Sequence, residues 1–253
     1  MTKRRALSVL APLIVALLAV ALAVFAPAAL LDARLHAVTE GRLRLADTSG
    51  TVWKGRGLAT NAQRTWSLPL GWKVDPLRLA RGDVAVTLQP AEAGDLPRGN
   101  IMWRDATLAL DGVAFTLPAT VLGATTGFGS AMAFGGYIAF DAPHLAWSAT
   151  GGDGSATVRW SGARVSGIAG TLALGTVNAN LAPRNGRIEG RVDNRGGDVR
   201  IDGEFAWSPA GVEVNATLAA LPSTPPAIVR ALGALGTADA NGAVHVQWRS
   251  GPR

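Results

Sequence analysis

Residues able to do chemistry are few in this sequence and do not form a known catalytic or metal-binding pattern. There are three histidines, His36, His144 and His245, and no cysteine. None of the histidines has a second histidine or a carboxylate at metal-ligand spacing, so no zinc motif is present. The lack of cysteine excludes disulfides, thiolate metal sites and a cysteine nucleophile.

Nucleophile and phosphate-loop motifs are also missing. The sequence has no Gly-x-Ser-x-Gly elbow. The glycine-rich stretches 127–129 and 135–136 lack the Lys-Ser/Thr that completes a phosphate-binding loop. Asp198 and Asp202 alternate with Arg200, which indicates a solvated charged strand face. The sequence therefore predicts a protein that is not an enzyme and has no cofactor, metal or small-molecule substrate.

The positive charge does not indicate a nucleic-acid partner. The formal net charge is +6, but Lys3, Arg4 and Arg5 supply part of it. Removing these three from the 24 Lys and Arg leaves 21, against 18 Asp and Glu. The remaining arginines are dispersed along the chain, whereas nucleic-acid binding needs a patch that neutralises several phosphates together.

A long apolar segment near the N-terminus is the first element that would position the remainder of the chain. No charged residue occurs between Arg5 and Asp32, so residues 6–31 exceed the roughly 20 apolar residues that span a bilayer. A signal peptide has an apolar region of only about 7–15 residues. We therefore expect an uncleaved transmembrane helix over residues 6–31, with cleavage after the small residues near Phe25 as the alternative.

The flanking charges predict the orientation of this anchor. The positive-inside rule places residues 1–5 in the cytoplasm and the remainder in the periplasm, as a single-pass protein of the bacterial inner membrane. We divide the remainder into a juxtamembrane segment, residues 32–48, and a β-rich periplasmic domain, residues 49–253.

The remainder has the period-two pattern of β-strands. In residues 198–207, 211–221 and 244–248, apolar and polar side chains alternate. Turn signals such as Asn185-Gly186 separate the runs. The pattern predicts a mainly β fold, an antiparallel, meander-like twisted sheet that could be open or closed.

Two regions depart from this rhythm. Residues 120–136 are rich in Gly, Ala and Thr, and we expect a loop or irregular crossover there. Residues 224–233 begin with Thr-Pro-Pro and end with Gly233, which predicts a short helix before the last strand.

The eight tryptophans have two interpretations. Trp103, Trp160, Trp207 and Trp248 match the apolar faces of their strands, which favours core packing. The alternative is an aromatic-lined binding groove.

One stretch resembles a family motif. Ser49–Gly57 reads S-G-T-V-W-K-G-R-G, similar to the S-G-T-L-W-x-G-x-A signature that follows the membrane anchor in type II secretion system protein N. Leu70–Leu79 resembles that family's L-x-W-x-L-x-P-L-x-L segment. The matching positions are Gly50, Thr51, Trp53, Gly55, Trp72 and Pro76. Gly50 and Gly55 suit turns on either side of a short strand, so we expect a structural role for the motif.

The resemblance implies a non-enzymatic accessory component of the type II secretion machinery. Its partners would be other secretion proteins, such as the platform components or the outer-membrane secretin. The motif also resembles segments of AsmA-like envelope proteins, which leaves a second hypothesis: a β-groove that binds or conveys lipid. That hypothesis predicts a continuous apolar strip along a concave face.

Overall fold

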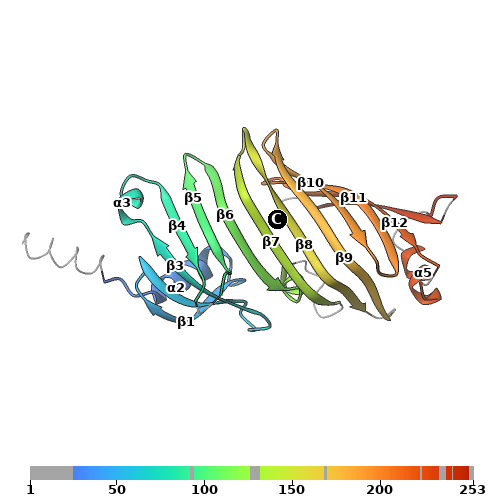
Figure 1. Ribbon diagram of the computed structural model, residues 1–253, viewed down its shortest axis with the longest axis horizontal. Coiled ribbons are helices and arrows are strands. Elements are labelled where there is room, and N and C mark those ends of the chain that lie inside the picture. Colours follow the sequence, from blue (N-terminus) through green and yellow to red (C-terminus); the bar gives the residue numbers. More distant parts are fainter. Residues whose placement is uncertain are drawn as a thin grey trace, which may run out of the picture.

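The computed structural model describes residues 25–91, 94–125, 132–167, 170–222, 224–233, 238–240 and 242–250. In this part of the chain, thirteen strands form one antiparallel sheet, and their order in space is their order in the sequence (Figure 1). The predicted β meander is therefore confirmed. Of the open and closed forms that the sequence allowed, the sheet is open.

The elements have the following bounds. The strands are β1 (Arg44–Gly50), β2 (Lys54–Thr60), β3 (Ser67–Val74), β4 (Val84–Gln89), β5 (Arg98–Arg104), β6 (Thr107–Pro118), β7 (Ala133–Ser148), β8 (Gly151–Gly167), β9 (Gly170–Arg184), β10 (Arg187–Arg195), β11 (Val199–Ser208), β12 (Gly211–Ala220) and β13 (Ala243–Ser250). The helices described are α2 (Ala29–Val38), α3 (Pro76–Leu79), α4 (Val121–Thr125) and α5 (Pro226–Gly233).

One face of the sheet carries rows of apolar side chains. Directly opposed residues on neighbouring antiparallel strands share a face, and one such row runs through Leu117, Ile138, Trp160 and Val177 on β6 to β9. The adjacent row on the other face runs through Thr116, Ala139, Arg159 and Asn178. The alternation in the sequence thus separates an apolar face from a polar one.

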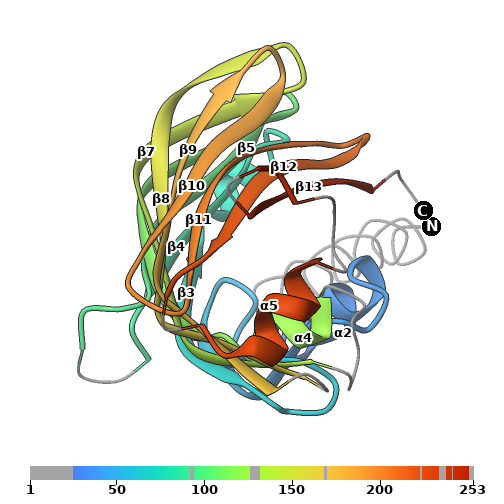
Figure 2. The same ribbon diagram turned by 90° about the vertical axis from the view of Figure 1, so that its right-hand side faces the viewer.

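The sheet curls toward its apolar face. Figure 2 shows the strands as a curved wall, with α2, α4 and α5 inside the curve. Ile228 and Leu232 of α5 are buried against Leu174, Val199 and Val244 of the sheet. The concave face is therefore the apolar one, and these helices cover part of it.

A second group of buried side chains closes the other end of the concave face. Ala28, just before α2, is buried with Leu45 and Trp72, and Leu31 and Leu35 of the helix pack against them. The helix therefore joins the N-terminal end of the described chain to the sheet.

The structure modifies several expectations of element boundaries. The short helix at residues 224–233 is confirmed as α5. Strand structure begins at Arg44, earlier than expected, so residues 32–48 contain most of α2 and most of β1. The region 120–136 is less irregular than expected, because α4 occupies its start and β7 begins at Ala133.

Most of the expected transmembrane segment, residues 6–24, lies outside the described residues. No helix in the described part of the chain is both long and apolar enough to cross a membrane. At the end of that segment, Pro27 forms a bridge with Thr51 and Ala28 is buried, so the chain has joined the β domain by Pro27.

Candidate functional surfaces

The residues of the sequence motif lie together where β1, β2 and β3 meet. Trp72 is directly opposite Gly55, and its indole Nε1–H donates a hydrogen bond to the carbonyl oxygen of Thr51 at 3.2 Å. A Cβ atom on Gly55 would lie 2.5 Å from the Trp72 ring. The glycine therefore leaves room for the indole, which is buried.

A tight turn joins β1 to β2, where we expected a short strand. Gly50 has φ of +93°, and a Cβ there would lie 2.5 Å from the Lys54 carbonyl oxygen. The N–H of Thr51 donates to the Lys54 carbonyl at 2.9 Å, and the Lys54 N–H donates to the Thr51 hydroxyl at 3.2 Å. The motif thus builds a turn.

This turn also ties the incoming chain to the rest of the domain. The N–H of Val52 donates to the Ala26 carbonyl at 3.0 Å, and the N–H of Val74 donates to the Trp53 carbonyl at 2.7 Å. Pro76 follows directly as the first residue of α3, which Asp75 caps through its carboxylate. The structure therefore brings all the predicted motif residues into one junction.

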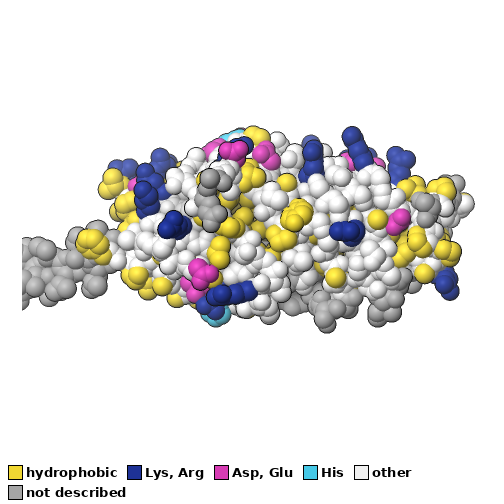
Figure 3. Space-filling model, turned by 60° about the horizontal axis from the view of Figure 1, so that its bottom comes forward, with side chains coloured by type: hydrophobic (Ala, Val, Ile, Leu, Met, Phe, Trp, Pro, Cys, Tyr) yellow, Lys and Arg dark blue, Asp and Glu magenta, His cyan; other side chains and the backbone are white. Residues whose placement is uncertain are grey.

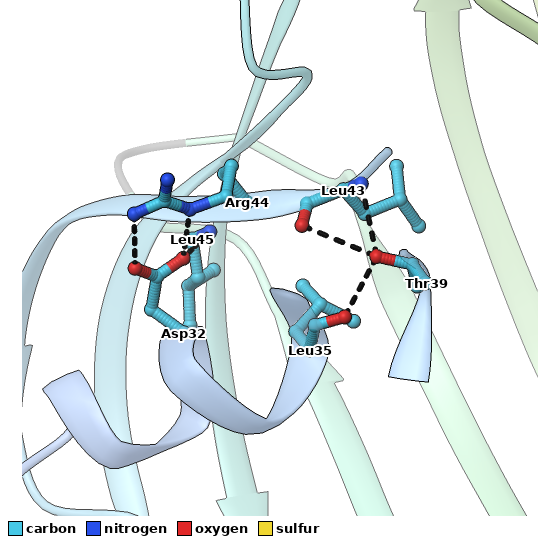
Figure 4. A network of polar contacts seen from close by, with 6 residues as sticks. All are labelled: Asp32, Leu35, Thr39, Leu43, Arg44 and Leu45. Atoms are coloured by element: carbon cyan, nitrogen blue, oxygen red, sulfur yellow. Dashed lines mark hydrogen bonds and ion pairs between the residues drawn. The ribbon is translucent and has the colours of Figure 1, made fainter. Parts of the chain in front are cut away.

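An ion pair fixes α2 to the outer edge of the sheet (Figure 4). Arg44 donates to both carboxylate oxygens of Asp32, at 2.9 and 2.7 Å, and the N–H of Leu45 donates to the same carboxylate at 2.8 Å. The hydrogen bonds from Arg44 lower the pKa of Asp32 to about 2. Because Leu45 lies on β1, the carboxylate occupies a main-chain donor of that strand.

The two edge strands of the sheet differ. Besides the contact with Asp32, β1 has an irregularity between Ala46 and Ser49, and Asp47 has φ of +51°. Bulges of this kind disrupt an edge and hinder pairing with another strand. The edge at β1 is therefore blocked.

Strand β13 has no such protection along most of its length. Its register with β12 is unbroken. The Ala243 carbonyl accepts from the N–H of Asp239, so the main chain of Ala243 points away from β12. Main-chain groups of alternate residues point the same way, so those of Gln247 and Arg249 also point outward. Within the described residues, no segment pairs with them.

Tryptophans on the concave face are more exposed than expected. Trp103, Trp207 and Trp248 are 44%, 38% and 51% exposed, so their prediction as core residues is wrong, whereas Trp160 is partly buried. The exposed three lie near the ends of odd-numbered strands, which all end at the same edge of an antiparallel meander. We call this line of strand ends, which also holds Trp147, the tryptophan edge. It runs across the sheet and is distinct from the edge strands β1 and β13.

A polar cluster lies on the convex face. The Nδ1 atom of His144 is 2.6 Å from Asp111, and its Nε2 atom is 3.2 Å from Asp153. Asp111 first, and then Asp153, raise the pKa of His144. Sequence reasoning missed this cluster, because the three residues come from β6, β7 and β8 at unrelated spacings. No group of three or more side chains suited to a metal ion occurs in the part of the chain that the structure describes.

These features define a one-sheet scaffold with an apolar concave face, a polar convex face and two unlike edges. The chain belongs to the type II secretion system protein N family, whose model matches residues 41–247. The match runs from just before β1 into β13 and confirms the resemblance found in the sequence. No curated protein and no solved structure shows a significant match.

Proposed function

We propose that this protein is a non-enzymatic accessory component of the type II secretion machinery, held in the inner membrane by the apolar segment before Phe25. Its periplasmic β domain contacts other proteins of the apparatus. The observation that carries this proposal is the family match over residues 41–247. The fold supports it, since a curved sheet offers long surfaces and an edge for contacts.

The contact that the structure supports best is strand addition at β13. An extended segment of a partner can pair with an exposed sheet edge through main-chain hydrogen bonds. Gln247 and Arg249 offer outward main-chain groups, and Trp248 supplies an exposed apolar side chain beside them. The blocked edge at β1 lacks these features.

Photocrosslinking in intact cells tests this contact. A photoreactive residue at Gln247 should capture type II secretion proteins, and one at Arg159, exposed in the middle of the convex face, should not. Deletion of the gene should also impair secretion of folded exoproteins. Unchanged secretion, together with no apparatus protein captured at Gln247, would contradict the proposed role.

A second function, lipid binding, is favoured by the concave face. The lipid hypothesis predicts a continuous apolar strip, and the row of apolar side chains across β6 to β9, through Leu117, Ile138, Trp160 and Val177, supports it. Large apolar side chains along the tryptophan edge are exposed to solvent. Monomeric soluble proteins rarely expose large contiguous apolar patches without a ligand or partner.

Lipid analysis of the purified full chain tests this second function. Trp103→Glu places a charge on the concave face, and Tyr137→Glu is a matched control because Tyr137 is exposed on the convex face. The lipid hypothesis predicts co-purifying lipid that Trp103→Glu reduces and Tyr137→Glu does not. Equal lipid content in all three proteins would assign any bound lipid to other parts of the chain.

A further inference from the structure

We propose that the β1–β4 end of the domain lies on an anionic membrane surface. Lys54 and Lys73 would contact lipid phosphates, while Leu77 and Leu79 would enter the interfacial layer. The inference rests on the membrane anchor of the proposed function. It adds a second point of attachment, which would hold the sheet at a defined angle to the bilayer.

The first observation is a pair of facing lysines. Lys54 on β2 and Lys73 on β3 are directly opposite each other on the convex face, and both are exposed. Like charges in opposed positions destabilise a sheet. Neither lysine forms an ion pair within the described residues. Apart from Lys3, they are the only lysines in the chain. Two adjacent lysines without ion-pair partners in the described chain suit contact with a surface that carries phosphate groups.

The second observation is an apolar and basic turn beside the lysines. Leu77 and Leu79 of α3 are 71% and 42% exposed. Arg78 lies between them, Arg81 follows two residues after Leu79, and both arginines are exposed. Apolar side chains interleaved with arginines suit the boundary between lipid head groups and acyl chains, where the apolar groups insert and the cations meet phosphates.

The third observation is the position of the chain that enters the domain. Phe25 is 74% exposed and begins the described chain. Hydrogen bonds lead from Ala26 to the β1–β2 turn, and from Trp53 to Val74, two residues before α3. In Figure 1, the start of the described chain and α3 both lie at the left end of the molecule. A membrane that holds the preceding segment would thus face α3.

The charges at this end favour an anionic surface. Figure 3 shows Lys and Arg side chains gathered with hydrophobic ones at the left end of the view, where β1 to β4 lie. Three carboxylates are nearby, and one of them, Asp83, pairs with Arg104 at 3.7 Å. Asp75 is engaged as the cap of α3 and by Arg78, and Asp47 is exposed. The exposed cations outnumber them, because Lys54, Lys73, Arg78 and Arg81 share this end.

Fluorescence quenching in vesicles provides the test. The chain has no cysteine, so Leu77→Cys gives a single labelling position in the full chain. Val229→Cys on α5, which is 44% exposed, is the matched control. The labelled proteins would be reconstituted with the β domain outside, in vesicles that contain phosphatidylglycerol and nitroxide-labelled lipid. We expect strong quenching at position 77 and little at position 229.

The lysines are tested in the same system. Replacing both, with Lys54→Gln and Lys73→Gln, should weaken the contact about fivefold per lysine, since each basic residue near an anionic surface contributes on the order of 1 kcal/mol. Quenching at position 77 should fall in this double variant. It should also fall when the protein with both lysines is placed in vesicles of phosphatidylcholine alone, which carry no net negative charge. The matched control, Arg159→Gln with Arg195→Gln on the convex face, should leave the quenching unchanged.

Flotation separates this inference from the anchor on which it rests. Protein that floats with the vesicles but shows equal quenching at positions 77 and 229 would overturn the membrane contact and leave the anchor in place. Protein that fails to float at all would overturn both. Strong quenching that persists after both lysines are replaced would overturn their role.

Discussion

The ring centroids of Trp147 and Trp207 lie 5.2 Å apart, although three strands separate β7 from β11. In a flat sheet four strand spacings would amount to about 19 Å. The contact shows how tightly the sheet curls at this edge. Gly152 of β8 lies directly opposite Trp147, and a Cβ atom there would clash with the Ala146 carbonyl oxygen and lie 2.9 Å from Pro183 of β9.

The Trp147–Trp207 contact should contribute measurable coupling energy. Tilted aromatic pairs contribute about 0.5–1.5 kcal/mol beyond their burial. A double-mutant cycle with Trp147→Leu and Trp207→Leu, measured by denaturant unfolding of the full chain, should give a coupling energy in that range. A coupling energy near zero would show that the contact between the two rings does not contribute to stability. Trp248→Leu with Trp147→Leu is the control, because no contact joins those rings.

Gly55→Ala should destabilise the domain by about 1–3 kcal/mol, the usual effect of overpacking. The added methyl group would meet the buried Trp72 ring and the carbonyl oxygen of Ser49, at 2.5 and 2.6 Å. Gly94→Ala is the matched control, because no atom lies within 4 Å of the added group. Denaturant midpoints measure both. Equal midpoints would show that the junction tolerates a side chain at position 55.

Asp32→Asn should lower the free energy of unfolding by about 1–2 kcal/mol at neutral pH, since it weakens hydrogen bonds to a charged acceptor. The pKa of Asp32 is lowered from 3.8 to about 2 in the folded protein. Its contribution is therefore complete above about pH 4 and is lost as the pH falls toward 2. The difference between wild type and variant should shrink over this range.

Glu40→Gln is the control for Asp32→Asn. Glu40 follows α2 and pairs with Arg42, but its side chain is 81% exposed. Exposed ion pairs contribute little, so this variant should match wild type at every pH. If the two variants behave alike, the link between α2 and β1 does not depend on the ion pair.

His144 should titrate above the ordinary histidine value of 6.5. Because the folded protein raises this pKa, the stabilisation by the charged imidazole is complete below pH 6.5 and is lost as the pH rises through the raised value. NMR titration of the imidazole measures it. Asp111→Asn should lower the pKa more than Asp153→Asn does, because Asp111 is the larger cause of the shift. The reverse order would contradict the geometry.

The sequence allowed much of the fold to be predicted, because alternation is local. Residues 198–207 and 211–221 alternate cleanly, and both form strands of the expected kind. The Pro-Pro start and Gly233 end predicted α5. The bulges could not be read this way. Near Gly175, which has φ of +72°, the register shifts so that Leu174 faces the core.

The candidate surfaces were harder to predict than the strands. The resemblance singled out Gly50, Gly55 and Trp72 and gave them a structural role, but their meeting in one junction depends on the pairing of β2 with β3, which the sequence did not predict. Alternation correctly placed Trp103 on the apolar face, but the exposure of that face depends on curvature and on which parts the helices cover. Neither property is local in the sequence.

The two unlike edges of the sheet also limit how copies of the protein could join. If β13 of one molecule paired with β1 of the next, the sheets would continue head to tail, and such a contact repeats without end and builds fibres. The carboxylate of Asp32 and the distortion at Asp47 close β1 to a neighbour. An extended segment can therefore add at β13, but β1 offers no second site, so copies of the protein do not join head to tail into a continuing sheet.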